Sequence, residues 1–201
     1  MTRVAILDYG MGNLRSVARA VERTGGDPLV TSDPTEAETA DAMVVPGVGA
    51  FAACMDGLRD TGLDTTVRRF VGSDRPLLGV CLGMQVLFDR SDEGDAEGLR
   101  MFAGQVRRLP GTVKVPHIGW NEVSWTGDHP LVAGISSGTR FYFVHSYACV
   151  PNEPVTVGET EHGIRFAAAV ARDAVFATQF HPEKSGDAGL EIYRNLIKAA
   201  A

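Results

Sequence analysis

One cysteine stands in a pattern that suits a nucleophile. The stretch Gly79–Gly83 reads Gly-Val-Cys-Leu-Gly, and it lies between a short apolar run and a segment with helical apolar spacing. A Gly-x-nucleophile-x-Gly sequence at a strand-to-helix junction is typical of a nucleophile elbow, because small flanking residues permit the tight turn. The first N–H groups of the following helix and its dipole favour a thiolate, which is the reactive form of cysteine. We therefore predict that Cys81 is a catalytic nucleophile.

The other two cysteines lack such a pattern. Cys54 lies in Phe-Ala-Ala-Cys-Met and Cys149 in Tyr-Ala-Cys-Val. Free cysteine is often buried as a small hydrophobic residue, and we interpret both positions in that way. Three widely spaced cysteines without a CxxC pair favour a reducing compartment over a disulfide framework, so we expect a cytoplasmic protein.

A nucleophilic cysteine needs a base, and the sequence offers one far downstream. An alternating strand pattern runs into His181, Pro182 and Glu183. In an extended chain, residues two apart project to the same side, and proline favours extended geometry in the residue before it. His181 would accept the thiol proton and later protonate the leaving group, while Glu183 would orient the imidazole. His-Pro-Glu alone is a weak signal, but together with the elbow it predicts a Cys-His-Glu triad.

Backbone N–H groups near this triad would stabilise an oxyanion. The N–H of Leu82 follows the nucleophile directly, and Gly47 and Gly49 flank Val48 after another predicted strand. Flanking glycines would let the Val48 peptide turn toward the site. An ordinary glycine-rich loop explains the same fragment about equally well. We predict an oxyanion hole at Val48, Gly49 and Leu82.

The order of the predicted elements indicates an α/β fold. In the first half of the chain, short β-branched runs alternate with amphipathic stretches: Val4–Leu7 with Leu14–Thr24, Ala42–Val45 with Phe51–Phe70, and Leu77–Val80 with Leu82–Phe88. This alternation is typical of βαβ units around a parallel sheet. From about Gly104, shorter strand patterns follow one another between turn residues, at 105–109, 122–125, 141–144, 155–159, 165–171 and 175–180. They predict antiparallel additions.

We therefore expect one domain over residues 1–201, with a mostly parallel central sheet flanked by helices, antiparallel strands in the C-terminal half and a last helix at 188–200. The formal net charge is −6 and the basic residues are scattered, so we expect no nucleic-acid partner. No apolar run approaches the length of a bilayer crossing, so no membrane association is expected.

Motifs for cofactors and metals are incomplete. The segment Gly10–Arg15 lacks the third glycine of a dinucleotide-binding turn, and no phosphate-binding P-loop occurs. The His-x-Glu of His181–Glu183 has no downstream PCxxC to complete a zinc deaminase site. We expect neither a cofactor nor a metal.

Six segments spread along nearly the whole chain carry the motifs of a known family. They are DYGMGNLRSV at 8–17, VPGVGAF at 45–51, GVCLGMQVLF at 79–88, PHIGWN at 116–121, YFVHSY at 142–147 and ATQFHPEKSG at 177–186. Together they resemble the class I glutamine amidotransferases, and within them the glutaminase subunits of imidazole glycerol phosphate synthase. The resemblance implies that Cys81 attacks the side-chain amide of glutamine, that His181 protonates the departing ammonia, and that water cleaves the glutamyl thioester to glutamate.

The resemblance also implies residues that bind glutamine. Gln85 matches a position that contacts the substrate, and Glu93 matches the acidic residue for its α-amino group. His145, Ser146 and Tyr147 match the segment that holds the α-carboxylate. From the residues alone, Gln85 is equally compatible with a solvated position and YFVHSY with a core strand.

One stretch departs from the family. Residues 98–104 read GLRMFAG, with Arg100 and Met101 where the family has a more glycine-rich form.

A partner chain is implied as well, because the glutaminase pattern occupies all 201 residues and the acceptor site is then expected elsewhere. The resemblance identifies the partner as a cyclase subunit with a (β/α)8 barrel, which forms a heterodimer and joins the ammonia to a phosphorylated ribonucleotide in histidine biosynthesis. Candidate interface residues are Asn13, Trp120, Asn121 and Lys184, although ordinary packing or a solvated charge explains them equally.

Two other functions stay open at this point. An ammonia donor of the same fold, serving pyridoxal phosphate or another amidated product, would keep the triad but should differ at 8–16 and 116–121. An inactive binding module, or a cysteine hydrolase of small γ-glutamyl compounds, belongs to another class. Selective alkylation of Cys81 would separate a reactive site from an inert one, and dependence on a partner would separate an ammonia donor from a free-standing hydrolase.

Overall fold

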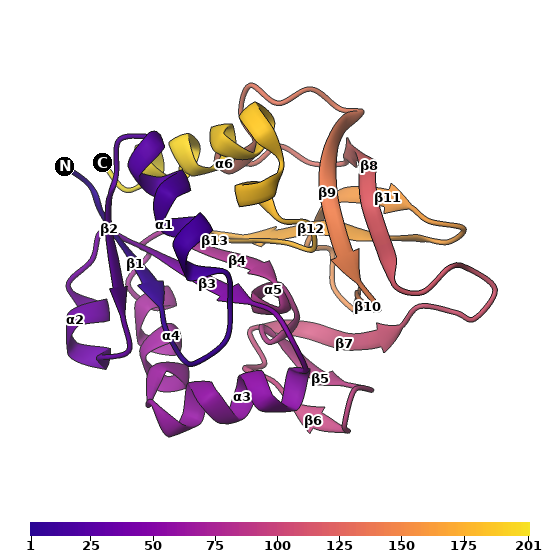
Figure 1. Ribbon diagram of the computed structural model, residues 1–201, viewed down its shortest axis with the longest axis horizontal. Coiled ribbons are helices and arrows are strands. Elements are labelled where there is room, and N and C mark those ends of the chain that lie inside the picture. The colour runs from indigo at the N-terminus through magenta and orange to yellow at the C-terminus, as the bar shows by residue number, and fades with distance from the viewer.

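A nine-stranded sheet forms the centre of the computed structural model, which describes all residues from Met1 to Ala201 (Figure 1). Five neighbouring strands are parallel: β2 (Asp27–Thr31), β1 (Arg3–Leu7), β3 (Ala42–Gly47), β4 (Leu77–Cys81) and β13 (Val175–Thr178). Four antiparallel strands continue the sheet: β12 (Arg165–Arg172), β11 (Thr156–Glu161), β8 (His117–Trp125) and β9 (Thr139–His145). The predicted α/β class, with antiparallel additions in the C-terminal half, is confirmed.

Helices cover both faces of the parallel strands, which explains the nearly continuous apolar runs of these strands. Along β1, Val4 and Ile6 belong to one buried core and Ala5 and Leu7 to the other. The first core packs under α1 (Leu14–Arg23) and α6 (Gly186–Ala199), whose ribbons are labelled in Figure 1. The second packs under α2 (Pro34–Glu38), α3 (Phe51–Asp60) and α4 (Leu63–Val71).

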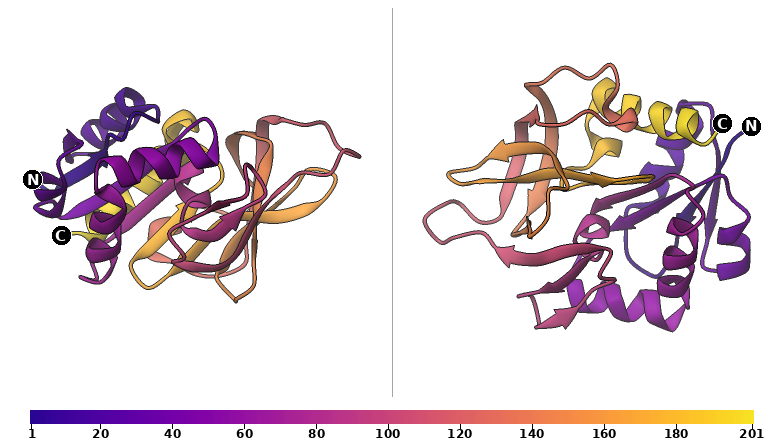
Figure 2. Two further views of the ribbon diagram at one scale, coloured as in Figure 1. Left: turned by 90° about the horizontal axis from the view of Figure 1, so that it is seen from below. Right: turned by 180° about the vertical axis from the view of Figure 1, so that it is seen from behind.

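A second, smaller sheet extends the core beneath α3. Its strands lie in the order β10 (Tyr147–Pro151), β7 (Phe102–Arg108), β5 (Phe88–Ser91) and β6 (Ala96–Glu97). Phe88 of β5 and Phe102 of β7 join the same core cluster as α3. Figure 2 shows that the helices gather on one side of the molecule, whereas the small sheet and the antiparallel strands of the large sheet form the other side. None of the helices combines the length and the hydropathy that a bilayer crossing requires.

Two predicted helical stretches differ from the structure. The stretch predicted at 51–70 forms two helices, α3 and α4, because Gly62 between them takes a φ of +74°. The stretch predicted at 82–88 is a single turn, α5 (Leu82–Gln85), after which the chain enters β5 at Phe88. A short buried apolar run has the same pattern in a helix and in a strand, so periodicity did not separate them.

One residue of the stretch 98–104 has a glycine-like backbone. Arg100 takes a φ of +56°, a left-handed conformation in which glycine is the favoured residue. Its guanidinium pairs with the Glu97 carboxylate at 2.7 Å. An arginine therefore stands at a turn where glycine would be the less strained residue.

Candidate active site

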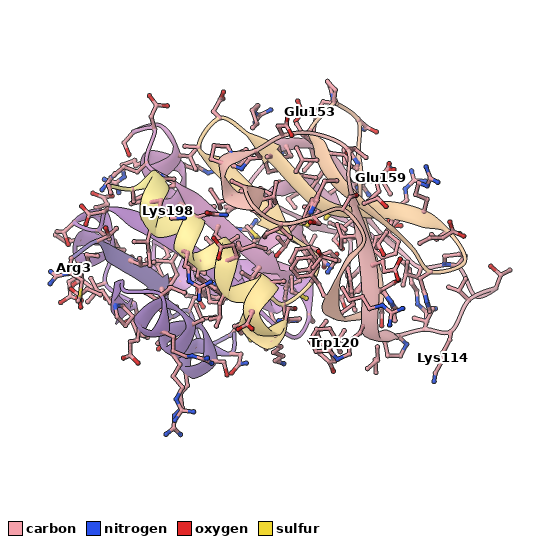
Figure 3. All side chains as sticks on the ribbon, turned by 90° about the horizontal axis from the view of Figure 1, so that it is seen from above. Arg3, Lys114, Trp120, Glu153, Glu159 and Lys198 are labelled. Atoms are coloured by element: carbon pink, nitrogen blue, oxygen red, sulfur yellow. The ribbon has the colours of Figure 1, made fainter.

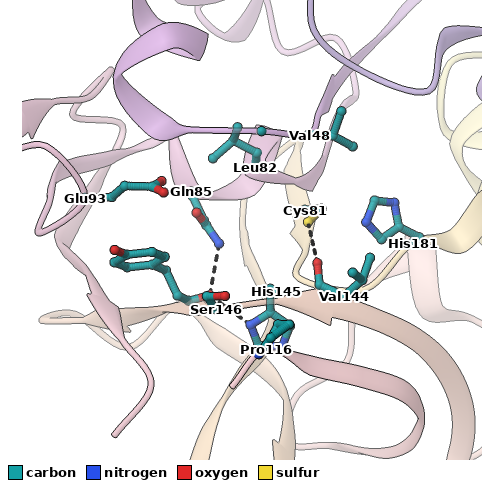
Figure 4. Close-up of a pocket in the computed structure, with 12 residues that line it drawn as sticks. Val48, Cys81, Leu82, Gln85, Glu93, Pro116, Val144, His145, Ser146 and His181 are labelled. Atoms are coloured by element: carbon teal, nitrogen blue, oxygen red, sulfur yellow. Dashed lines mark hydrogen bonds between the residues drawn. The ribbon is translucent and has the colours of Figure 1, made fainter. Parts of the chain in front are cut away.

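The carboxyl ends of parallel strands bring the predicted catalytic segments to one edge of the sheet. In the register of the sheet, Gly47 of β3 lies opposite Cys81 of β4, and Thr178 of β13 lies opposite Val80. Ligand sites of open α/β sheets lie at this edge. The loop after β3, the elbow after β4 and the segment after β13 therefore meet around Cys81, as Figure 4 shows.

The strand-to-helix elbow predicted from the glycine spacing is confirmed. Cys81 has φ +56° and ψ −107°, ends β4 and precedes α5 directly. A Cβ on Gly83 would lie only 1.8 Å from the Val45 carbonyl oxygen, so the turn needs glycine there because of space. Cys81 and His181 line the same cavity, and the Cys81 sulfur lies 4.0 Å from the Val144 carbonyl oxygen (Figure 4).

His181 and Glu183 are paired, but a turn brings them together rather than an extended chain. His181 is extended, and η2 (Pro182–Lys184) is a 3-10 turn that directs the Glu183 carboxylate back to the ring. His181 Nδ1 donates to Glu183 Oε1 at 2.9 Å, and both side chains are buried. The other ring nitrogen, Nε2, has no hydrogen-bond partner. The predicted pairing is confirmed, whereas the predicted geometry was wrong for Glu183.

The electrostatics of this pair favour an imidazolium. Burial alone lowers the pKa of His181, but Cys81 and Glu183 together raise it to about 10. A protonated ring beside Cys81 stabilises a thiolate and is ready to act as a general acid.

A cavity of about 320 Å³ gathers the other predicted site residues. Its lining consists of Val48, Gly49, Cys81, Leu82, Gln85, Glu93, Pro116, Val144, His145, Ser146, Tyr147 and His181. All three oxyanion candidates and all five substrate candidates are therefore at one site. Glu183 is absent from the lining because it lies behind His181.

The Gln85 side chain is held by two acceptors. Its Nε2 donates to the Tyr147 carbonyl oxygen at 3.0 Å and to Gln179 Oε1 at 3.0 Å. Gln179 in turn places its Nε2 3.6 Å from Cys81 Sγ. Sequence reasoning missed Gln179, although it lies in the ATQFHPE segment just before His181. The solvated position left open for Gln85 is excluded, since the residue is 4% exposed.

The Glu93 side chain lines the cavity and also caps a helix. Its Oε2 accepts from the N–H of Phe51 at 2.8 Å, at the first residue of α3. The residue before the helix, Ala50, offers no side-chain cap. An unpaired N–H at a helix N-terminus favours a carboxylate, which accounts for this contact.

His145 is held in one neutral form by a chain of hydrogen bonds. Its Nδ1 donates to the Tyr147 carbonyl oxygen at 2.8 Å, so its Nε2 must accept from His117 Nδ1 at 3.0 Å. His117 Nε2 then accepts from Asn121 Nδ2 at 3.4 Å. Burial lowers the pKa of His145 to about 3 and that of His117 to about 4. Sequence reasoning missed His117 as a support of the site.

These two histidines predict a stability loss in mild acid. The unfolded chain takes up a proton on each near pH 6.5, whereas the folded chain takes them up only near pH 4 for His117 and pH 3 for His145. The free energy of unfolding should therefore fall as the pH decreases from 6.5 toward 4. The slope is up to about 1.4 kcal/mol per pH unit for each histidine.

Chemical denaturation at a series of pH values checks this expectation. His117→Gln keeps a donor for His145 and an acceptor for Asn121 but does not titrate, so the slope should drop by up to about 1.4 kcal/mol per pH unit. Equal slopes for the wild-type chain and the variant would refute the assignment.

The four interface candidates lie outside the cavity lining. Trp120, on β8, is 55% exposed and projects from the surface in Figure 3. Lys184 Nζ lies 5.8 Å from the centroid of the Tyr142 ring. Asn121 donates to the Glu161 carbonyl oxygen at 2.8 Å, and Asn13 precedes α1. Their role at an interface stays a prediction.

Comparison with known proteins gives one consistent family. Residues 5–199 match the family model of glutamine amidotransferase class-I. Imidazole glycerol phosphate synthase subunit HisH of Dehalococcoides mccartyi strain CBDB1 is 48% identical, over 98% of this chain and 97% of that protein. The same subunit of Nocardia farcinica is 50% identical, over 98% of this chain and 99% of that protein.

Two solved structures share the fold. A glutamine amidotransferase superposes with a TM-score of 0.78 at 22% identity, covering 98% of each chain. The glutaminase domain of Trypanosoma brucei CTPS with bound acivicin superposes with a TM-score of 0.71 at 20% identity, over 100% of this chain and 94% of that one. With the fold shared at low identity and HisH subunits matched at nearly half of all positions, the chain belongs to the class I glutamine amidotransferases and, within them, to the glutaminase subunits of imidazole glycerol phosphate synthase, which act in histidine biosynthesis.

Proposed function

We propose that residues 1–201 form one glutaminase unit that hydrolyses glutamine through a thioester on Cys81 and passes the ammonia to a cyclase subunit with a (β/α)8 barrel, its partner in a cytoplasmic heterodimer. One observation carries the catalytic part of the proposal. Cys81 lies on a strained elbow and lines the same cavity as His181, whose Nδ1 is held by Glu183 and whose Nε2 is unpartnered. The names of the HisH relatives support the partner.

The first half of the reaction forms the thioester. With a pKa of about 10, His181 carries a proton at neutral pH, and the sulfur of Cys81 bonds to the side-chain carbonyl carbon of glutamine. The N–H groups of Leu82 and of the Val48–Gly49 loop receive the developing oxyanion. His181 Nε2 then donates its proton to the amide nitrogen, the carbon–nitrogen bond breaks, and ammonia leaves.

The second half releases glutamate. Neutral His181 takes a proton from water, and the hydroxide formed attacks the thioester carbonyl through the same oxyanion hole. The carbon–sulfur bond breaks, glutamate leaves, and the thiolate–imidazolium pair is restored. Glu183 keeps one tautomer of the ring through both halves because its carboxylate accepts only from Nδ1–H.

Three groups are suited to hold the substrate. Gln85 Oε1 accepts no hydrogen bond from the protein, so it is free to accept from the glutamine amide. We assign the α-amino group to the Glu93 carboxylate. We assign the α-carboxylate to the 145–147 segment, where the ring of His145 is neutral and already hydrogen bonded.

Two variants of Glu93 separate substrate binding from helix capping. Glu93→Gln keeps an oxygen for the Phe51 N–H but loses the charge, so the KM for glutamine should rise about tenfold or more while stability changes by less than about 0.5 kcal/mol. Glu93→Ala also removes the cap and should cost about 1 kcal/mol of stability. Steady-state kinetics and chemical denaturation measure the two effects, and an unchanged KM in Glu93→Gln would rule out the assignment.

The surface beside the cavity suits a protein partner. Ile118 and Trp120 are 59% and 55% exposed, and residues two apart on β8 share one face. Pro116, just before this strand, lines the cavity. The Trp120 and Tyr142 rings lie 6.2 Å apart, and the Lys184 ammonium lies over Tyr142. Exposed aromatic groups are enriched at protein interfaces, and we propose that this face receives the cyclase.

Glutamate release tests the proposal. The purified chain is assayed with glutamine alone, with the cyclase subunit, and with the cyclase subunit plus its nucleotide ligand. Strong stimulation in the complex supports a coupled ammonia donor. Equal turnover in all mixtures contradicts the partner, and no turnover in any of them contradicts the enzymatic role.

A further inference from the structure

We propose that Gln179 is a further catalytic residue, which donates a hydrogen bond from its side-chain amide to the Cys81 sulfur and stabilises the thiolate, while Gln85 positions that amide. The inference rests on the proposed role of Cys81 as the nucleophile. It concerns a contact across the core, since Gln179 follows β13 and Gln85 belongs to α5.

The direction of the Gln179 amide follows from its neighbours. The Tyr147 carbonyl oxygen can only accept, so the Gln85 atom 3.0 Å from it must be the NH₂ nitrogen. The same nitrogen lies 3.0 Å from Gln179 and must meet an oxygen there. The opposite atom of the Gln179 amide is therefore its NH₂ group, which lies 3.6 Å from Cys81 Sγ. The Tyr147 carbonyl oxygen therefore determines which atom is oxygen and which is nitrogen in both side-chain amides.

Burial makes this donor effective. Gln179 is 0% exposed and Gln85 is 4% exposed, so water does not compete for the amide hydrogens. The sulfur is the sole acceptor of the Gln179 NH₂ group. A thiol is a weak acceptor, whereas hydrogen bonds to an ionised group are roughly twice as strong as those between neutral groups. The contact is therefore worth more with a thiolate than with a thiol.

Few other side chains act on the sulfur. The titratable groups around Cys81 come from four different segments: Tyr9, Cys54, Cys149 and His181. Burial raises the pKa of Tyr9, of Cys54 and of Cys149, so these three are neutral at pH 7. The Val144 carbonyl oxygen, 4.0 Å from the sulfur, is an acceptor and gives an anion no support. Gln179 and His181 are the side-chain donors that remain.

Alkylation of the free chain by iodoacetamide tests the inference without using glutaminase activity. The rate at each cysteine is followed by peptide mapping from about pH 5 to about pH 9, since only the thiolate reacts. In Gln179→Met, Cys81 should react about tenfold more slowly at neutral pH, and its profile should move to higher pH by about one unit. Gln105→Met, the same substitution on β7 outside the cavity, serves as the matched control and should match the wild type.

A second variant keeps the test decisive if Gln179→Met does not fold. Gln85→Met leaves Gln179 in place but removes the group that orients it, so Cys81 should react more slowly than in the wild type. If the variants fold and the pH dependence of Cys81 alkylation equals that of the wild type, the inference is overturned while the proposed function stays intact. A wild-type Cys81 that reacts no faster than Cys54 and Cys149 would overturn the proposed function and, with it, the role of Gln179.

Discussion

Changing Cys81 to serine is expected to lower glutamate release by the complex by about 10⁴-fold or more, because the reaction loses its thiolate and the activated acyl group of the thioester. Serine differs from cysteine by one atom, so the elbow and the cavity should persist. A hydroxyl is a far weaker acid than a thiol, so the serine would stay protonated and would be a much weaker nucleophile. Steady-state release of glutamate in the presence of the cyclase partner and its ligand measures the effect.

Cys149→Ala is the matched control for this variant. Cys149 is fully buried in the core and outside the cavity, so its loss should lower stability by about 1 to 2 kcal/mol through a small cavity while activity stays within about threefold of the wild type. A Cys81→Ser chain that keeps its activity would contradict the mechanism.

Changing Gly83 to alanine is expected to be among the most destabilising single substitutions in the chain. The new Cβ would lie 1.8 Å from the Val45 carbonyl oxygen and 2.8 Å from its carbon. Neither atom belongs to a flexible side chain, so β3 or the elbow must shift. Overpacking against backbone costs about 3 kcal/mol or more. The shift also displaces Cys81, and activity should fall in the fraction that still folds.

Gly111→Ala provides the control, since no atom lies within 4 Å of its Cβ position. Its φ is not left-handed, and the added methyl group should leave stability unchanged or raise it by up to about 1 kcal/mol. Chemical denaturation compares both variants with the wild type. A Gly83→Ala chain as stable as the Gly111→Ala chain would show that the elbow has room for a side chain.

The parallel half of the fold was predictable because its strands are covered on both faces. β3 and β4 are buried throughout, and their apolar runs stand out in the sequence. Strand β2 (Asp27–Thr31) was not predicted from the sequence. It contains a proline and lies at the sheet edge, where only Thr31 is buried, so it has no continuous apolar run. Strand β10 (Tyr147–Pro151) was not predicted either, because only one residue separates it from β9 and no glycine, proline or asparagine marks a turn there.

The residues of the candidate site could be predicted where the residues that define them lie close together in one segment of the sequence. The glycines around Cys81 and the spacing of His181 and Glu183 constrain the backbone of their own segments. Contacts between distant segments carry no such signal. Gln85 and Gln179 are 94 residues apart, and His117 and His145 are 28 residues apart. Their hydrogen bonds follow from sheet register and the crossing of elements, which a single sequence does not specify.

Covalent inactivation by a chloroketone analogue of glutamine tests the central claim most directly. The complex is treated with the analogue, residual glutamate release is followed, and the modified residue is identified by mass spectrometry. We predict one label per chain on Cys81, appearing in step with the loss of activity and slowed by glutamine. Inactivation with the label on another residue, or labelling of Cys81 that glutamine does not slow, would contradict the account.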